Sequence, residues 1–346
     1  MFIDSASDQL LIIIFLLSTI AIWISGIKLT LAIDAITTHF NLGEAFGGMV
    51  FLAIVTNLPE IAITAVAAYH RDYDIAISNI LGGIAIQTVV LAIIDIVGVG
   101  RTAPLTEKGH SKILIIEGAS LIFILSLVII ASQFPKNVFF ARSTPFEWII
   151  LAIWIGTIYL TSKYLSKKKS IFAQKQEIKH NLRNPRKKFK GSIYAAVVVL
   201  AVGAIITLFA GWGLEVTGEQ LANRWGMSGV LFGGTILALC TALPEISTGI
   251  ASAKIRDYNM AVSDIFGGNA FLPVLFLVAS MIGNDPILPN LKPSDIYLTV
   301  LGIILTGIYM IGMVLHSKKQ ILRMGVDSFI VVIVYLLGLW GLLKLV

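Results

Sequence analysis

The chain has 346 residues, of which 57% are hydrophobic and only 13% are charged, and its formal net charge is +6. Ordinary soluble domains carry about 25% charged residues, so this composition excludes a soluble enzyme and indicates an integral membrane protein. Its single cysteine, Cys240, excludes an intramolecular disulfide and fits a thiol buried in a helix.

Apolar runs recur along the whole chain, each with about the 20 residues that cross a bilayer. The first follows an acidic N-terminus without the basic region of a cleaved signal peptide, so we expect it to be retained. The fold class is therefore an all-α polytopic membrane protein, expected in the cell membrane, with about ten transmembrane helices. Their approximate centres fall in residues 8–26, 43–69, 75–99, 112–132, 146–164, 192–212, 228–253, 260–283, 295–315 and 327–345.

The longest polar segment, residues 166–191, follows the fifth span and is strongly basic. Because Lys and Arg concentrate in loops that stay in the cytoplasm, we predict that this loop is cytoplasmic and that both termini lie outside. Nucleic-acid binding is the weaker interpretation, since the run lacks interleaved aromatic residues. The segment separates a first half, residues 1–165, from a second half, residues 192–346.

The two halves repeat each other at a constant offset of 185 residues. The stretch LAIVTNLPEIAITAVAAYHRDYDIAISNILGG, residues 52–83, aligns without a gap with LALCTALPEISTGIASAKIRDYNMAVSDIFGG, residues 237–268. Leu-Pro-Glu, Arg-Asp-Tyr and Gly-Gly occur in both at the same spacing. Because the offset spans an odd number of crossings, the copies run through the bilayer in opposite directions. Inverted repeats of this kind form the framework of many secondary transporters.

Each copy places a proline and a glutamate inside an apolar span, as Pro59-Glu60 and Pro244-Glu245. A proline within a helix frees a backbone carbonyl, and a membrane tolerates this only beside protein or a water-filled cavity. An ionisable residue within a span is a functional candidate, and carboxylate and carbonyl oxygens are ligands that suit Na⁺ or Ca²⁺. We therefore predict a cation site near the midplane; structural carboxylates, protonated or paired within the bundle, are the alternative.

These motifs resemble the cation/Ca²⁺ exchanger superfamily, the sodium/calcium exchangers and their prokaryotic relatives. Those proteins carry two inverted α-repeats, each with a G-T-S-L-P-E-like helix followed by a G-N-x-x-G-S-N-like helix. The resemblance covers essentially the whole chain and places the two motifs at about residues 48–87 and 233–272. It implies that this chain is a transporter rather than an enzyme. It also implies a set of metal-binding residues, to which we add three weaker candidates. Together these are Glu60, Glu245, Thr56, Thr241, Ala53, Ala238, Asn57, Gln87 and Asp264.

The resemblance assigns these residues different roles. Glu60 and Glu245 match the paired central carboxylates of the family. Thr56 and Thr241 match its threonine ligands, although a threonine hydroxyl also bonds readily to its own helix. The backbone carbonyls at Ala53 and Ala238 match those that join the family site. Asn57, Gln87 and Asp264 are weaker candidates, because each also suits a contact between helices or at a helix end.

The chain departs from the family pattern at several ligand positions. The family serine before Leu-Pro-Glu is Asn57 in the first copy, and the polar residue late in the second motif is Gln87. Asp264 stands where the first copy has Asn79, and it adds a carboxylate. At the remaining positions that differ from the family, the polar side chain is missing: these are Ala242, Gly83, Gly268 and Leu272.

Charge balance indicates the kind of exchange. Two glutamates neutralise one Ca²⁺, two Na⁺ or two protons, so we expect a secondary antiporter that exchanges Ca²⁺ for Na⁺ or H⁺ by alternating access. Its partners are inorganic cations and the lipid bilayer, with no resident cofactor, no nucleic acid and no obligatory protein partner. Exchange of Na⁺ for H⁺, or of another divalent cation, is the alternative.

Two other classes of function stay open. A non-exchanging channel or scaffold would fit the apolar Leu272, and an intramembrane enzyme would fit the stretch YDIAISN, residues 73–79. Neither a Gly-x-Gly-Asp nor an H-E-x-x-H motif accompanies that stretch, which disfavours the enzyme.

Other polar motifs have simpler interpretations. Asp95 and Glu117 lack partners in the repeat, so we expect helix–helix or interfacial contacts from them. The Arg-Asp-Tyr turns at residues 71–73 and 256–258 are predicted to be salt-bridged helix connections. The double glycines at residues 82–83 and 267–268 are predicted to allow close helix packing.

Overall fold

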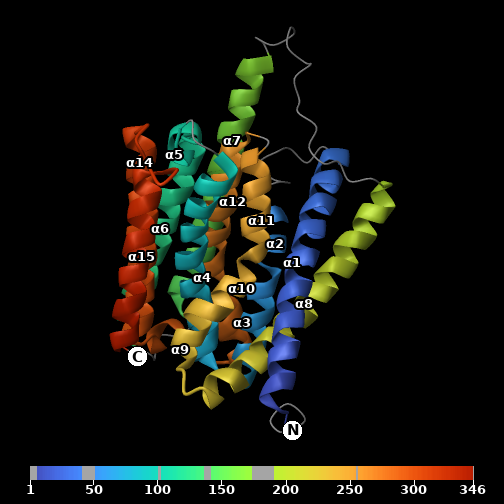
Figure 1. Cartoon of the computed structure of the whole chain (residues 1–346), viewed down its shortest axis with the longest axis vertical. Coiled ribbons are helices and arrows are strands. Elements are labelled where there is room, and N and C mark those ends of the chain that lie inside the picture. Colours follow the sequence, from blue (N-terminus) through green and yellow to red (C-terminus); the bar gives the residue numbers. More distant parts are fainter. Residues whose placement is uncertain are drawn as a thin grey trace.

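The computed structural model describes residues 6–40, 51–99, 103–135, 142–173, 191–254 and 256–345, which are almost entirely helical (Figure 1). Within these residues, 8 helices are long and apolar enough to cross a membrane, and one bent helix pair raises that number to 9. The predicted span at 43–69 begins outside the described residues, and most of the basic loop also lies outside them. The number of ten spans therefore stays a prediction.

The first half begins with a 32-residue apolar helix and ends with the helix that leads into the basic segment. Its elements are α1 (Asp8–His39), α2 (Phe51–Thr56), α3 (Leu58–His70), α4 (Tyr73–Ile94), the π-helical turn η2 (Asp95–Val99), α5 (Leu105–Lys108), α6 (Lys112–Ser132) and α7 (Pro145–Ala173).

The second half contains more interruptions. Its elements are α8 (Ile193–Arg224), α9 (Gly229–Phe232), the π-helical turn η3 (Gly233–Leu237), α10 (Ala238–Thr241), α11 (Leu243–Lys254), α12 (Tyr258–Phe271), the 3₁₀ turn η4 (Leu272–Val274), α13 (Leu275–Gly283), the 3₁₀ turn η5 (Leu288–Asn290), α14 (Pro293–Leu315), β1 (Gln320–Ile321), β2 (Met324–Gly325) and α15 (Val326–Leu345). The structure confirms the all-α fold class, and the two-residue strands β1 and β2 form only a short antiparallel pair between α14 and α15.

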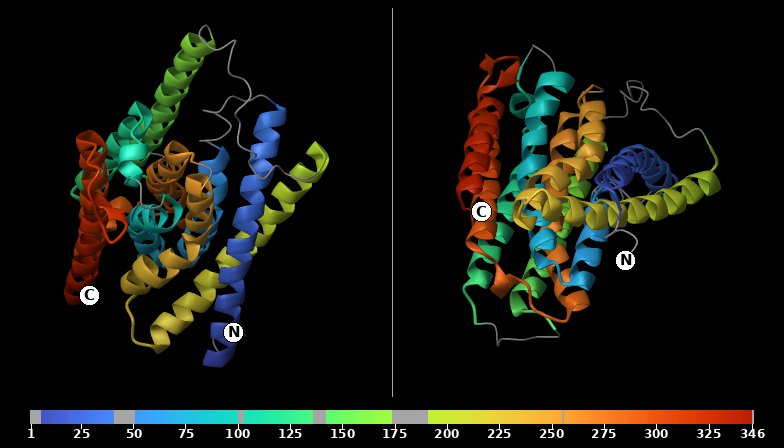
Figure 2. Two further views of the ribbon diagram at one scale, coloured as in Figure 1. Left: turned by 45° about the horizontal axis from the view of Figure 1, so that its top comes forward. Right: turned by 60° about the horizontal axis from the view of Figure 1, so that its bottom comes forward.

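The most buried spans are α4 and the α12–α13 pair, each with 78% of its apolar window buried, against 28% for α1. They form the centre of the bundle. Helices α1 and α8 pack together along one edge, and α14 and α15 lie along the opposite edge (Figures 1 and 2). In Figure 1, α1 begins and α15 ends at the lower end, whereas α7 ends at the upper end. The start of α1 and the end of α15 thus lie opposite the end of α7. Which membrane face each end occupies stays a prediction.

The two Leu-Pro-Glu helices are broken rather than kinked. The breaks fall at Asn57, between α2 and α3, and at Ala242, where the axis turns by 43°. Pro59 and Pro244 follow as the second residue of a new helix. The prediction of a mid-helix proline is therefore wrong in detail. A proline in the first turn costs no hydrogen bond, because the first N–H groups of a helix have no partner within it.

The Arg-Asp-Tyr turns have the same geometry in both halves. Arg71 and Arg256 each adopt a left-handed conformation with φ of 65°. The next residues cap the following helices: Asp72 accepts a hydrogen bond from the Ile75 N–H, and Asp257 accepts one from the Met260 N–H. The aspartates thus act as N-caps. The salt bridges expected within these turns stay a prediction.

Two glycines outside the compared stretch extend the repeat. Gly26 of α1 and Gly211 of α8 lie 185 residues apart. An added Cβ at Gly26 would lie 2.6 Å from the Pro244 Cβ, and one at Gly211 would lie 2.6 Å from the Ala62 Cβ and 3.2 Å from the Pro59 carbonyl oxygen. Each edge helix therefore packs on the Leu-Pro-Glu helix of the other half, and only a glycine permits this approach.

Two further predictions need correction. Gly82 packs against Gly234 as expected, but nothing lies within 4 Å of a Cβ added at Gly267, so close packing is wrong there. Cys240 is half-buried rather than fully buried. The span predicted at 260–283 is confirmed as Tyr258–Gly283, with the 3₁₀ turn η4 within it, where Pro273 lacks the N–H that a regular α-helix needs.

Candidate cation site

The broken helices place the two glutamates at the centre of the molecule. Glu60 lies in the first turn of α3 and is 0% exposed, and Glu245 lies in the first turn of α11 and is 1% exposed. A helix N-terminus carries a partial positive charge that stabilises a nearby carboxylate. Each helix break therefore places a helix N-terminus where it stabilises the charge of the glutamate that follows. This stabilisation is smaller than the free-energy cost of burying a carboxylate charge.

The polar contacts of the pair cross between the halves. The Thr241 hydroxyl lies within hydrogen-bonding reach of the Glu60 carboxyl, and Thr56 lies likewise beside Glu245. The two carboxyls are close enough to interact electrostatically. Gln87 of α4 adds a direct contact, because its Nε2 donates to Glu60 Oε1 at 3.2 Å. The structure thus brings five of the predicted residues together.

Most of the remaining oxygen atoms at this centre are acceptors without a donor. Among the described residues, Glu60 Oε2, Gln87 Oε1 and both carboxylate oxygens of Glu245 have no hydrogen-bond partner of regular geometry. Buried acceptors without donors are costly. A cation placed among them would satisfy several at once and would also balance the carboxylate charge.

The double glycines hold α4 and α12 against the site. A Cβ added at Gly268 would lie 3.2 Å from Asn57 Nδ2 and 3.9 Å from Gln87 Oε1. At the related position Gly83, the Cβ would lie 3.5 Å from Leu272 Cδ1. The position that carries an amide in the first half is therefore an apolar wall in the second, where Leu272 is fully buried.

Asp264 lies on α12, next to the pair. It is 8% exposed and interacts electrostatically with Glu245. Its Oδ2 accepts a hydrogen bond of 2.7 Å from Thr248, whose hydroxyl also lies 3.3 Å from the Glu245 carbonyl oxygen. Thr248 was missed from the sequence because the corresponding residue of the first half is Ile63. The only signal for it was its place one turn after Glu245.

The two predicted carbonyl ligands, Ala53 and Ala238, differ in what the structure describes of them. The Ala238 carbonyl accepts hydrogen bonds from the Ala242 N–H and from the Thr241 hydroxyl, both at 3.1 Å. It would join a cation only if the Thr241 hydroxyl turned away. Ala53 belongs to α2, but its side chain lies outside the described part of the chain. Within that part, no group of three or more His, Cys, Asp or Glu residues is placed to hold a metal ion. The candidate site therefore combines two carboxylates with neutral oxygen atoms.

Two other predicted polar residues make contacts between helices, away from the central pair. Asp95 accepts hydrogen bonds from the Leu105 and Gly325 N–H groups at 2.8 and 2.7 Å, and from the Ser328 hydroxyl at 2.8 Å. These contacts join the turn η2, after α4, to α5, β2 and α15, which confirms the predicted polar contact between elements. Glu117 makes the expected helix–helix contact, to Ser263 of α12.

Comparisons with known proteins agree with this architecture. The inner membrane protein YrbG of Escherichia coli is 26% identical over 258 residues, which are 73% of this chain and 74% of that protein. The protein described as "Putative antiporter CaxA" of Alkalimonas amylolytica is 23% identical over 250 residues, or 72% and 73% of the two chains.

Two solved structures share the fold. The sodium-calcium exchanger NCX_Mj, soaked with Na⁺ and Sr²⁺, has a TM-score of 0.61 and 20% identity, with 97% of this chain and 99% of that chain covered. Native YfkE has a TM-score of 0.65 and 17% identity, with 96% and 92% covered.

The sequence pattern of the sodium/calcium exchanger protein family matches residues 10–167 and 195–344, one match in each half of the chain. These two matches cover most of the chain. The protein belongs to the sodium/calcium exchanger family, and it is a multi-pass membrane transporter rather than an enzyme.

Proposed function

We propose that the protein exchanges Ca²⁺ for Na⁺ or H⁺ by alternating access at a site built around Glu60 and Glu245. The observation that carries the proposal is the meeting of these two buried carboxyls, one from each half, each beside the threonine of the other half. A site shared by two inverted halves opens to opposite membrane faces when one half moves against the other.

The oxygen atoms at the centre suit a calcium ion. Ca²⁺ takes about six to eight oxygen ligands from carboxylates, carbonyls, amides and water. Glu60 and Glu245 supply up to four, and Gln87 Oε1, Thr56 and Thr241 surround them. One divalent ion balances the charge of both glutamates.

Exchange follows from the cost of leaving the pair bare. Two carboxylates in a dry interior repel each other and lose their hydration. When Ca²⁺ leaves, two Na⁺ or two protons restore the charge balance before the halves move again. The same site thus binds either kind of ion in turn, and transport needs no nucleotide.

The test is ⁴⁵Ca²⁺ uptake into proteoliposomes under imposed Na⁺ or H⁺ gradients. We expect saturable uptake driven by one of these gradients, and little change when a membrane potential is added, because a two-for-one exchange is electroneutral. Glu60→Gln and Glu245→Gln should remove uptake, whereas Glu107→Gln, which removes an acid outside the site, should retain it.

The outcome also separates the alternatives. Counter-ion flux without Ca²⁺ uptake would replace the proposal with Na⁺/H⁺ exchange, and uptake of a different divalent cation would change the ion but keep the site. Non-saturable flux that needs no counter-ion would identify a channel.

A further inference from the structure

A second buried acid lies outside the central pair. Glu117 of α6 is 1% exposed, and its Oε1 accepts a hydrogen bond of 2.9 Å from the Ser263 hydroxyl of α12. Its other oxygen, Oε2, has no hydrogen-bond partner among the described residues. A carboxylate held this way in the membrane interior needs a positive charge beside it or a proton on it.

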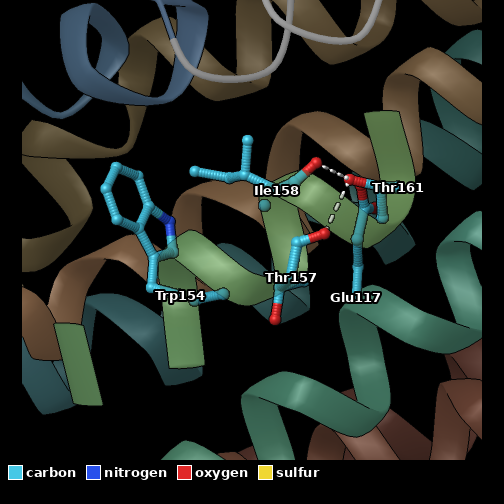
Figure 3. Close-up of a pocket in the computed structure, with 7 residues that line it drawn as sticks. Glu117, Trp154, Thr157, Ile158 and Thr161 are labelled. Atoms are coloured by element: carbon cyan, nitrogen blue, oxygen red, sulfur yellow. Dashed lines mark hydrogen bonds between the residues drawn. The ribbon is translucent and has the colours of Figure 1, made fainter. Parts of the chain in front are cut away.

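A small pocket adjoins this carboxyl. It lies between α6, α7 and α12, and Figure 3 shows Glu117 close to the α7 residues Thr157 and Thr161. Gly267 of α12 forms part of the wall, and a Cβ added there would meet no atom within 4 Å. The pocket therefore exists partly because position 267 lacks a side chain.

The two threonine hydroxyls of the pocket wall are available as acceptors. The Thr161 hydroxyl donates to the carbonyl oxygens of Thr157 and Ile158 at 2.9 and 3.0 Å, and the Thr157 hydroxyl lies 2.9 Å from both Ser120 Oγ and the Ile153 carbonyl oxygen. A hydroxyl that donates to the backbone keeps lone pairs for another donor or for a cation. Trp154 adds one neutral indole N–H donor, the other lining residues are apolar or glycine, and none of the described lining residues is basic, so the wall supplies no positive charge to Glu117.

We propose that this pocket binds one monovalent cation, Na⁺ or a proton, at Glu117. A single carboxylate with hydroxyl neighbours balances one positive charge but not two, so a divalent ion does not fit. The pocket is a different site from the Glu60–Glu245 pair, and cation binding there does not require that the central pair transports Ca²⁺.

The position of the pocket gives it a route of influence on the central pair. Ser263, which holds Glu117, directly precedes Asp264 on α12. Asp264 in turn contacts Thr248, one turn after Glu245. A change of charge at Glu117 therefore acts on the helix that borders the central site. Along α7, Thr161 also lies shortly before the basic segment, which begins at residue 166.

Infrared difference spectroscopy of the purified full-length protein in lipid nanodiscs tests this directly, because carboxylate, cation-bound carboxylate and carboxylic acid absorb at different frequencies. One arm titrates NaCl against choline chloride at fixed alkaline pH, and the other lowers the pH without Na⁺. We expect one arm to change a band that is absent in Glu117→Gln and present in Glu60→Gln. The Na⁺ arm would identify a sodium site, and the pH arm a proton site.

Two glycine variants leave Glu117 in place and test the volume of the pocket beside it. Gly267→Ala fills the pocket, and we expect the Glu117 band to need at least tenfold more Na⁺ or H⁺ to change. Gly307→Ala is the control, because a Cβ there also meets no atom within 4 Å but position 307 does not line the pocket. It should behave like the wild type.

The proposal is overturned if the band assigned to Glu117 stays that of a carboxylic acid throughout both titrations, since this describes a permanently neutral side chain fixed by Ser263. It is also overturned if Gly267→Ala and Gly307→Ala titrate alike. A response of Glu117 in a protein that shows no Ca²⁺ uptake would count against the proposed central function alone.

Discussion

The two inverted halves share a backbone plan but differ in the electrostatics that they give to the central site. Residues that stand 185 positions apart are called mates here. In the first half, Gln87 donates a hydrogen bond to Glu60, whereas its mate Leu272 provides only an apolar wall. In the second half, Asp264 adds a nearby acid, whereas its mate is the neutral Asn79.

This difference makes the two glutamates unequal. The Glu60 charge is partly stabilised by an amide, whereas Glu245 faces a neighbouring acid and has no such donor. Because a hydrogen bond to a charged group stabilises it and a like charge disfavours ionisation, we expect Glu245 to depend more on the transported cation. An inverted repeat thus fixes where the acids meet without making their surroundings identical.

The largest effect should come from the acids themselves. Each glutamate is proposed to pair with the buried Ca²⁺, and removing one partner of a buried ion pair costs about 3–5 kcal/mol. Glu60→Gln and Glu245→Gln should therefore each lower Ca²⁺ uptake by about a hundredfold or more. Uptake in proteoliposomes at matched protein density measures this. If either variant exchanged Ca²⁺ at the wild-type rate, that acid would not belong to the site.

The glycine mates test whether the two halves pack alike. Alanine at Gly26 or Gly211 would push the edge helix away from Pro244 or from the α3 surface around Ala62. Overpacking costs about 1–3 kcal/mol, so each variant should lower the exchange rate roughly tenfold. Gly307→Ala is the matched control, since it adds the same methyl group in open space. A large effect of only one of the two substitutions would show that the two halves do not depend equally on this close helix contact.

Substitutions at the mates Gln87 and Leu272 test whether the amide makes Glu60 different from Glu245. Gln87→Leu gives the first half the residue of the second and removes the donor to Glu60. Such a loss costs about 1–3 kcal/mol, which corresponds to a rise of about five- to a hundredfold in the KM for Ca²⁺. Leu272→Val, which changes the apolar mate conservatively, should change the KM much less. Equal effects would show that shape, not the amide, matters at this position.

Asp264→Asn makes the second half match Asn79 of the first. The variant weakens the contact with Thr248 but also removes a charge near Glu245. These effects oppose each other, so we expect the Ca²⁺ KM to change by less than about tenfold. Steady-state uptake kinetics provide the measurement. Complete loss of uptake would instead make Asp264 a third essential acid.

The smallest effect concerns the turn before α4. Burial, with the charge of Glu219 as a lesser cause, raises the pKa of Asp72 from 3.8 to about 6. Between these two values the folded protein binds more protons than the unfolded chain, so stability should increase as the pH falls through that window. Asp72→Asn retains a good N-cap residue and should flatten this slope in thermal unfolding. An unchanged slope would assign the pH dependence to other groups.

The sequence predicted the elements that depend on composition and on exact repetition. Long apolar runs located most spans, and the constant offset paired Glu60 with Glu245 and Thr56 with Thr241. The structure confirms that these four residues meet across the halves. Repetition also contained a signal that was missed, because Gly26 and Gly211 are mates outside the compared stretch.

Features that depend on three-dimensional neighbours could not be predicted in this way. Gly82 and Gly267 are mates, but Gly82 packs against Gly234 while Gly267 borders a pocket, and no local pattern distinguishes them. The Glu117 pocket likewise combines residues of the consecutive helices α6 and α7 with residues of α12, which belongs to the other half of the chain.

The central claim is that a single cation lies between one buried acid from each half, and an anomalous diffraction map of crystals soaked in Sr²⁺ tests it most directly. Sr²⁺ replaces Ca²⁺ and scatters strongly enough to be located without assumptions about the ligands. We predict one strong peak in contact with both the Glu60 and Glu245 carboxyls, lost in Glu245→Gln. A Sr²⁺ peak that touches neither carboxyl, in a protein that exchanges Ca²⁺ in liposomes, would contradict the account.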